Sequence, residues 1–127
     1  MIRVLTIRPA WAHAIFHLGK DVENRSWTTS YRGPMAIIAG KRMEPDVLLS
    51  LGIDPAAVRT GVLLGIVDLI DVVRDSRSSW AIPGDYHWML RNPRLLLSPI
   101  PMRGSLALGT LRMDIADHAC ATAFRQP

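Results

Sequence analysis

The sequence predicts a single α+β domain, a small mixed β-barrel of about six strands with two or three short helices. The 127 residues are enough for one domain of ordinary size and too few for two. Apolar residues make up 49% of the chain and charged residues 20%, which is typical of a globular protein with a buried core. Short strand-like segments outnumber the helical ones and no segment repeats, and this count indicates a closed or half-closed barrel.

The chain begins with a predicted strand and helix. Residues 2–7 alternate well enough for a strand. Pro9 then stands where the first turn of a helix tolerates it, and apolar residues recur at helical spacing up to residue 18. Gly19 can end this helix in the left-handed conformation, so we expect a helix over residues 9–18.

Residues 21–27 predict a strand with an unusually charged face. Side chains two positions apart lie on the same face of a strand, because successive side chains alternate between the faces. One face of this segment therefore carries Asp21, Glu23, Arg25 and Trp27.

The middle of the chain predicts the centre of the sheet. A turn signal at residues 31–34 precedes a short buried strand at 35–39, and a small helix is expected between Pro45 and Gly52. The strongest strand signal is residues 61–73, which are apolar on both faces and rich in β-branched side chains. We therefore expect this strand to be central and covered on both sides.

The last third predicts a loop, three further strands and a tail. Residues 74–85 are expected to form a loop, and Asn92-Pro93-Arg94 a turn with a solvated arginine. The tail, residues 113–127, has weak helical periodicity. The three candidate strands are residues 86–90, 94–98 and 106–111.

The net charge and the hydropathy of the chain indicate which partners it could bind and whether it could enter a membrane. The net charge is +4 and the pI about 10.0, which suits a polyanion such as RNA or DNA. Codon bias toward arginine would give the same excess, so charge alone leaves both interpretations open. No apolar run approaches the roughly 20 residues of a membrane-spanning helix, and Arg3 and Arg8 interrupt the N-terminal segment. We expect a cytoplasmic protein that does not enter a membrane.

Four segments, in this order, resemble the ASCH domain, the activating signal cointegrator homology domain of the PUA-like group of small β-barrels. They are LTIRPAWA (5–12), the Lys-x-x-Glu-x-Arg pattern of Lys20, Glu23 and Arg25, WTTSYRGPMAIIAGK (27–41), and GVLLGIVDLIDVV (61–73) followed by WMLRNPRLLLSPIPMRG (88–104). The resemblance covers about residues 5–109. It implies an ASCH domain over residues 1–112, followed by a C-terminal tail over 113–127.

The resemblance implies that a basic cleft between the first helix and the barrel is the ligand site, lined by Lys20, Glu23 and Arg25. Their chemistry suits a nucleotide, because an arginine can bind phosphate or a base edge with two parallel hydrogen bonds and a carboxylate accepts from an exocyclic amine. A desolvated lysine can also lose its proton, unlike arginine. Lys20 and Glu23 are therefore candidate catalytic residues. The expected nucleic-acid contacts are Arg8, Trp11, Lys20, Glu23, Arg25, Trp27 and Arg32.

Three functions are compatible with this cluster. The first is a non-catalytic module that binds RNA, another nucleic acid or a nucleotide-like small molecule. The second is hydrolysis of N4-acylcytidine, known for small relatives in which a lysine, a threonine three residues later and a distant glutamate act together. Here Glu23 occupies the threonine position, and the only other glutamate, Glu44, lies in a predicted helix.

The third function is a metal-dependent ribonuclease. His13 and His17 are one helical turn apart, a spacing that can chelate a metal, but no third ligand is evident. We therefore expect no metal and no cofactor, and the oligomeric state stays open. A plainer interpretation of the cluster is a surface salt bridge in which Glu23 only pairs with Lys20 and Arg25, worth about 0 to 1 kcal/mol.

Overall fold

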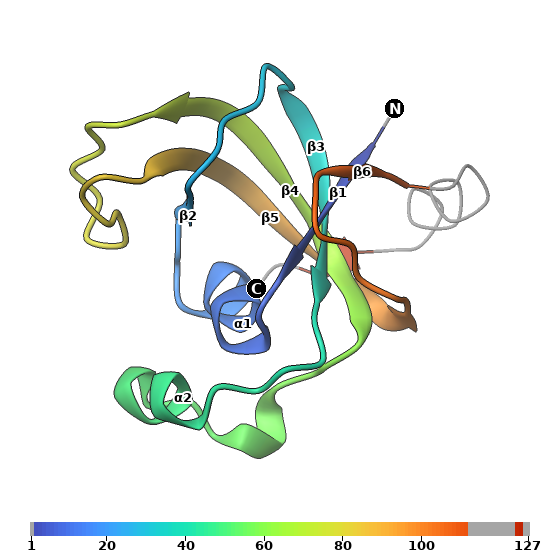
Figure 1. Ribbon diagram of the computed structural model, residues 1–127. Helices are drawn as coiled ribbons and strands as arrows, with labels where there is room; N and C mark the ends of the chain where they lie inside the picture. Colours follow the sequence, from blue (N-terminus) through green and yellow to red (C-terminus); the bar gives the residue numbers. More distant parts are fainter. Residues whose placement is uncertain (1, 112–123, 126–127) are drawn as a thin grey trace.

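The computed structural model describes residues 2–111 and 124–125 of the chain (Figure 1). Its helices are α1 (Pro9–His17), α2 (Pro45–Leu51) and the 3-10 helix η1 (Pro55–Ala57). Its strands are β1 (Arg3–Ile7), β2 (Val22–Arg25), β3 (Gly33–Ala39), β4 (Val62–Val73), β5 (Tyr86–Pro101), β6 (Gly109–Thr110) and β7 (Phe124–Arg125). The predicted α+β class, with about six strands and a few short helices, is confirmed.

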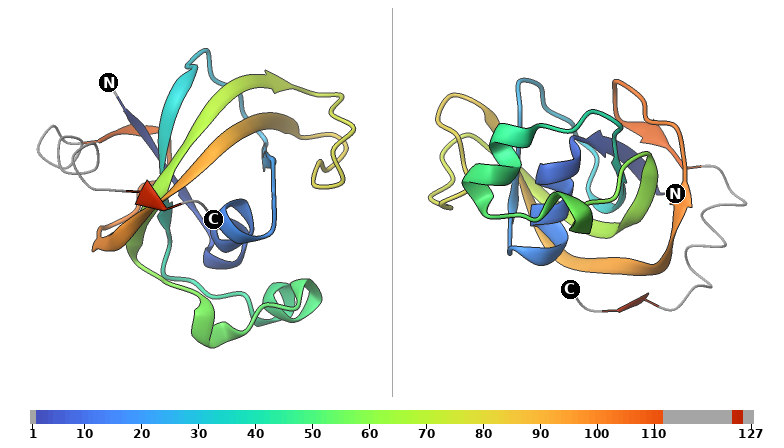
Figure 2. Two further views of the ribbon diagram at one scale, coloured as in Figure 1. Left: turned by 180° about the vertical axis from the view of Figure 1, so that it is seen from behind. Right: turned by 90° about the horizontal axis from the view of Figure 1, so that it is seen from below.

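The strands form one curved mixed sheet. Their order is β2-β5-β4-β3-β1-β6, and β7 pairs with β5 outside this path. Among the described strands, only β1 and β3 run parallel, and the other pairs are antiparallel. The sheet curls into a half-barrel, and α1 and α2 both lie across one end of it (Figure 2). No helix in the described part of the chain is long and apolar enough to span a membrane.

Strand β4 is central, as predicted, and both of its faces are buried over its first half. Its alternate side chains belong to two hydrophobic clusters, one inside the half-barrel and one on the opposite face of the sheet. Leu64 and Val67 lie in the first cluster, together with Phe16 of α1 and Trp88 of β5. Leu63 belongs to the second. A third, smaller cluster joins the two α-helices through Ala10, Leu48 and Ile53.

The helix boundaries follow the predicted signals. Pro9 and Pro45 each begin a helix, where the missing backbone N–H costs no hydrogen bond. Gly52 closes α2 with φ of 68°, and Gly19 has φ of 72° two residues after α1 ends. The turn at Gly19 directs the chain from α1 into β2 and places the residue between them, Lys20, against both elements.

The predicted turn at residues 92–94 is wrong. Residues 86–101 form one continuous strand, β5, which passes through Asn92 with φ of 57° and stays paired with β4 on both sides of it. Asparagine tolerates this left-handed conformation, so the chain bends without leaving the sheet. Arg94 is not solvated either, because its side chain is 22% exposed and donates to Asp68 at 3.2 Å.

Other predicted boundaries change at the edges of the sheet. The predicted strand over residues 21–27 is shorter and ends at Arg25, and of the predicted 106–111 strand only Gly109 and Thr110 pair, with β1. Of the predicted helical tail over 113–127, only residues 124–125 are described, where β7 pairs with β5. The helical prediction for the remaining tail residues lies outside the described part of the chain.

Candidate functional site

A buried cluster of charges lies where α1 passes into β2. Lys20 Nζ donates to Glu23 Oε1 at 2.8 Å and also to the carbonyl oxygen of Val22. Arg25 Nε lies 3.1 Å from the second carboxylate oxygen, Oε2, as an ion pair. The side chains of Lys20 and Glu23 are only 3% and 10% exposed. The expected pairing is therefore present, but the interpretation as a surface salt bridge is wrong because the pair is buried.

Neighbouring elements hold this charge cluster in place. The backbone N–H of Lys20 donates to the carbonyl of Ala14 in α1, and its Nζ lies 5.8 Å from the ring centroid of Trp11. Arg25 Nη2 donates to the carbonyl of Thr6 at 2.8 Å, which ties β2 to the end of β1. The Nε–H of Arg25 is buried without an aligned acceptor. Two cations share one carboxylate, so the cluster carries a net positive charge.

A pocket of about 320 Å³, here called the tryptophan pocket, opens directly above the cluster. Its floor includes Lys20 and Glu23, and its walls include Trp11 from α1 and Leu51 from α2. Residues 79–82 of the long loop between β4 and β5 complete the wall, with Trp80 among them. The pocket therefore combines aromatic and apolar walls with a charged floor, which is typical of sites for small ligands.

The loop that carries Trp80 is fixed by two buried or half-buried polar side chains. Asn24 donates from Nδ2 to the carbonyl of Trp80 and accepts at Oδ1 from the N–H of Ile82, both at 2.9 Å. The N–H of Ser76 donates to His87 Nδ1 at 3.1 Å, so the other ring nitrogen, Nε2, carries the proton and donates to the carbonyl of Ile82 at 2.7 Å. The wall is thus formed before any ligand binds.

A second pocket, of about 420 Å³, adjoins the first and is here called the basic cleft. It shares Trp11, Glu23 and Asn24 with the tryptophan pocket, and Lys20 does not line it. Four cationic side chains line it: Arg8, Arg25, Lys41 and Arg42. Of these, Arg8 is paired with Glu44 at 2.6 Å.

The structure brings together five of the seven residues expected to contact nucleic acid. Trp27 and Arg32 line neither pocket. The ring of Trp27 packs edge-on against Trp88, with centroids 4.8 Å apart, and Arg32 lies 3.5 Å from Asp71. The residues found in the pockets are Arg8, Trp11, Lys20, Glu23 and Arg25.

Sequence reasoning missed the contributions of Asn24, His87 and Trp80. Trp80 stands in a polar loop, and a tryptophan in such a loop is itself a signal of a binding surface. Asn24 could not be assigned, because its partners lie 56 and 58 residues away.

The two histidines of α1 lie side by side, with ring centroids 4.4 Å apart. Burial, and then the proximity of His17, lowers the pKa of His13. In residues 2–111 and 124–125, no three His, Cys, Asp or Glu side chains are close enough to hold a metal ion together. The histidine pair therefore gains no third ligand in that part of the chain.

Comparisons with known proteins agree with this architecture. The family model of the ASCH domain matches residues 5–98. The chain belongs to the ASCH domain family. Activating signal cointegrator 1 from Mus musculus is 30% identical over 141 residues, and its Homo sapiens counterpart is 28% identical over the same length. Both alignments cover 96% of this chain but 24% of the relative, so this chain spans about a quarter of the length of these relatives. The PUA-like barrel that the resemblance implied is confirmed.

Proposed function

We propose that this ASCH domain is a cytoplasmic module that binds RNA, or a nucleotide-like ligand, through the tryptophan pocket and the basic cleft. One observation carries the proposal: the buried cluster of Lys20, Glu23 and Arg25 lies at the junction of an aromatic pocket and a cationic cleft. Aromatic side chains stack on bases and cationic grooves bind the phosphate backbone.

The roles of the three charged side chains follow from their surroundings. Glu23 is held by cations at both oxygens, so its main effect is to fix Lys20 at the floor of the tryptophan pocket and Arg25 in the basic cleft. The excess positive charge of the cluster then attracts a phosphate or the acceptor edge of a base. Arg8 lies at the rim of the cleft, where its side chain is 55% exposed and its charge is paired with Glu44.

Binding of a short RNA is expected to weaken steeply with salt. Each phosphate neutralised by the cleft releases condensed counterions, so the slope of log K against log salt is about −0.7 per contacted phosphate for a single strand. Fluorescence anisotropy at several salt concentrations measures this slope. A slope near zero would contradict nucleic-acid binding and favour a ligand without phosphates.

Hydrolysis of N4-acylcytidine is the alternative, because Lys20 and Glu23 are buried at the floor of a ligand-sized pocket. The required distant glutamate has no candidate: Glu44 precedes α2, pairs with Arg8 and does not line the pocket. We therefore expect no release of cytidine from N4-acetylcytidine, measured by chromatography. Turnover that Lys20→Arg abolishes would establish the hydrolase instead, since arginine keeps its proton.

A further inference from the structure

The basic cleft continues beyond the tryptophan pocket into a third hollow of about 370 Å³. The two share Thr6, Gly40, Lys41, Ser105 and Leu106, so they form one continuous depression. Together with the tryptophan pocket they make a groove, here called the long groove. It runs from the loop carrying Trp80, past the charge cluster, to Arg103 of the segment after β5.

The long groove is positively charged along its length. Both lysines of the chain line it, Lys20 at one end and Lys41 in the middle, and the arginines continue the charge to Arg103. Lys41, Arg42 and Arg103 are exposed and make no ion pair with a carboxylate in the described part of the chain. Among the described residues that line the groove, Glu23 is the single carboxylate, and two cations neutralise it.

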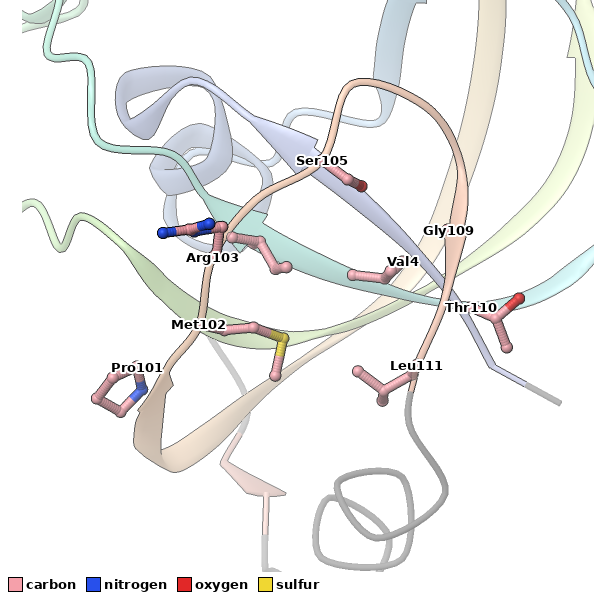
Figure 3. A pocket seen from close by; sticks show the side chains of 9 residues that line it. Val4, Pro101, Met102, Arg103, Ser105, Gly109, Thr110 and Leu111 are labelled. Atoms are coloured by element: carbon pink, nitrogen blue, oxygen red, sulfur yellow. The ribbon is translucent and has the colours of Figure 1, made fainter.

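The charged track ends at Arg103. Figure 3 shows the next hollow, where Val4, Met102 and Leu111 turn toward one another, and Arg103 points away from them. Among the described residues, Arg103 is the last cationic side chain that lines the long groove and this next hollow.

The floor of the long groove is preformed. The segment after β5 crosses the end of β1 so closely that a Cβ on Gly104 would lie 2.6 Å from Thr6 Cγ2. The N–H of Ser105 donates to Thr6 Oγ1 at 2.9 Å, while the Thr6 carbonyl accepts from Arg25. Thr6 thus joins the cluster to this segment, so a bound strand would meet a surface that is already ordered.

We propose that the long groove binds a single strand of RNA several nucleotides long, with one base in the tryptophan pocket and the backbone passing Lys41 to Arg103. This inference rests on the proposed function and names its ligand as an oligonucleotide rather than a free nucleotide. A single strand is favoured because an aromatic pocket can accept a base only when that base is unstacked. A duplex keeps its bases stacked, which leaves the pocket empty.

The test compares a nucleoside monophosphate, a single strand of about eight nucleotides and the matching duplex, all with the full chain. The single strand is expected to bind at least about tenfold more tightly than either of the others. The variant Arg103→Gln, at a residue that lines neither the tryptophan pocket nor the basic cleft, is expected to lower the salt slope of single-strand binding by about 0.7, leaving the monophosphate affinity within about twofold. Trp80→Ala is expected to weaken both ligands, by roughly 5-fold to 100-fold.

Arg59→Gln is the matched control, because Arg59 is an exposed arginine that lines none of these hollows. It should leave the slope unchanged, and all variants should melt like the wild type. Equal affinity for the monophosphate and the single strand would contradict the proposal that the long groove binds an oligonucleotide, while leaving the proposed function intact. Equal affinity for the duplex would overturn the choice of a single strand. Absence of binding to all three would overturn the proposed function itself.

Discussion

Glu23→Gln is expected to lower the free energy of unfolding by about 3 to 5 kcal/mol. The substitution keeps the size of the side chain but removes the negative charge that compensates Lys20, whose side chain is only 3% exposed. Removing the carboxylate leaves a buried ammonium group whose desolvation penalty is no longer offset. The free energy of unfolding therefore falls by more than the net contribution of the ion pair. Urea denaturation of wild type and variant measures the difference.

The double variant Lys20→Met/Glu23→Gln tests the cause. It removes the buried ammonium that Glu23→Gln alone leaves without a carboxylate, so the desolvation penalty at position 20 disappears. We therefore expect it to recover most of the stability lost by Glu23→Gln alone. A cost below about 1 kcal/mol for Glu23→Gln would contradict this account and indicate a pair as well solvated as one at the surface.

The burial of this pair bears on function as well as stability. An apolar core would fill the same volume between α1 and β2 at no desolvation cost, so the charges contribute little that folding requires. Lys20 and Glu23 line the tryptophan pocket and Arg25 lines the adjoining cleft, which is where the proposed ligand would contact them. The stability test measures what these three side chains contribute to folding, and the binding tests measure what the surrounding groove contributes to ligand affinity.

Local signals in the sequence were enough for most of the fold. Pro9 and Pro45 marked where helices begin, and Gly19 and Gly52 marked where the chain leaves them, because each acts through its own backbone conformation. The prediction at Asn92 was wrong because asparagine adopts the left-handed backbone conformation both in turns and at bends within a strand. Pairing with β4 decided between them, and pairing is not a local property.

The site was predictable only in part. The two-residue period placed Glu23 and Arg25 on one face, and the family resemblance added Lys20, but neither indicated that the cluster is buried. Trp27 was expected on the same face, yet β2 ends at Arg25 and the ring packs on Trp88 instead. Burial depends on how α1 and the β4–β5 loop close over β2, which only the assembled sheet determines.

Gly65→Ala is expected to cost about 3 kcal/mol or more in the free energy of unfolding. Gly65 lies in β4 next to a register shift, opposite Leu95 of β5. A Cβ at this position would lie 2.1 Å from the carbonyl oxygen of Arg94, a backbone atom that cannot rotate away. The two central strands would have to separate next to a register shift between them. Thermal and urea unfolding measure the loss.

Gly40→Ala is the control for this prediction. A Cβ on Gly40 would meet Thr6 Cγ2 at an ordinary 3.6 Å, and its φ lies outside the left-handed region, so the change should stay within about 1 kcal/mol of wild type. If Gly65→Ala proved as mild as Gly40→Ala, the close approach of β4 and β5 would not be required for the fold. The predicted difference arises because the nearest atom at Gly65 is a backbone oxygen at 2.1 Å, whereas the nearest atom at Gly40 is a side-chain methyl carbon at 3.6 Å.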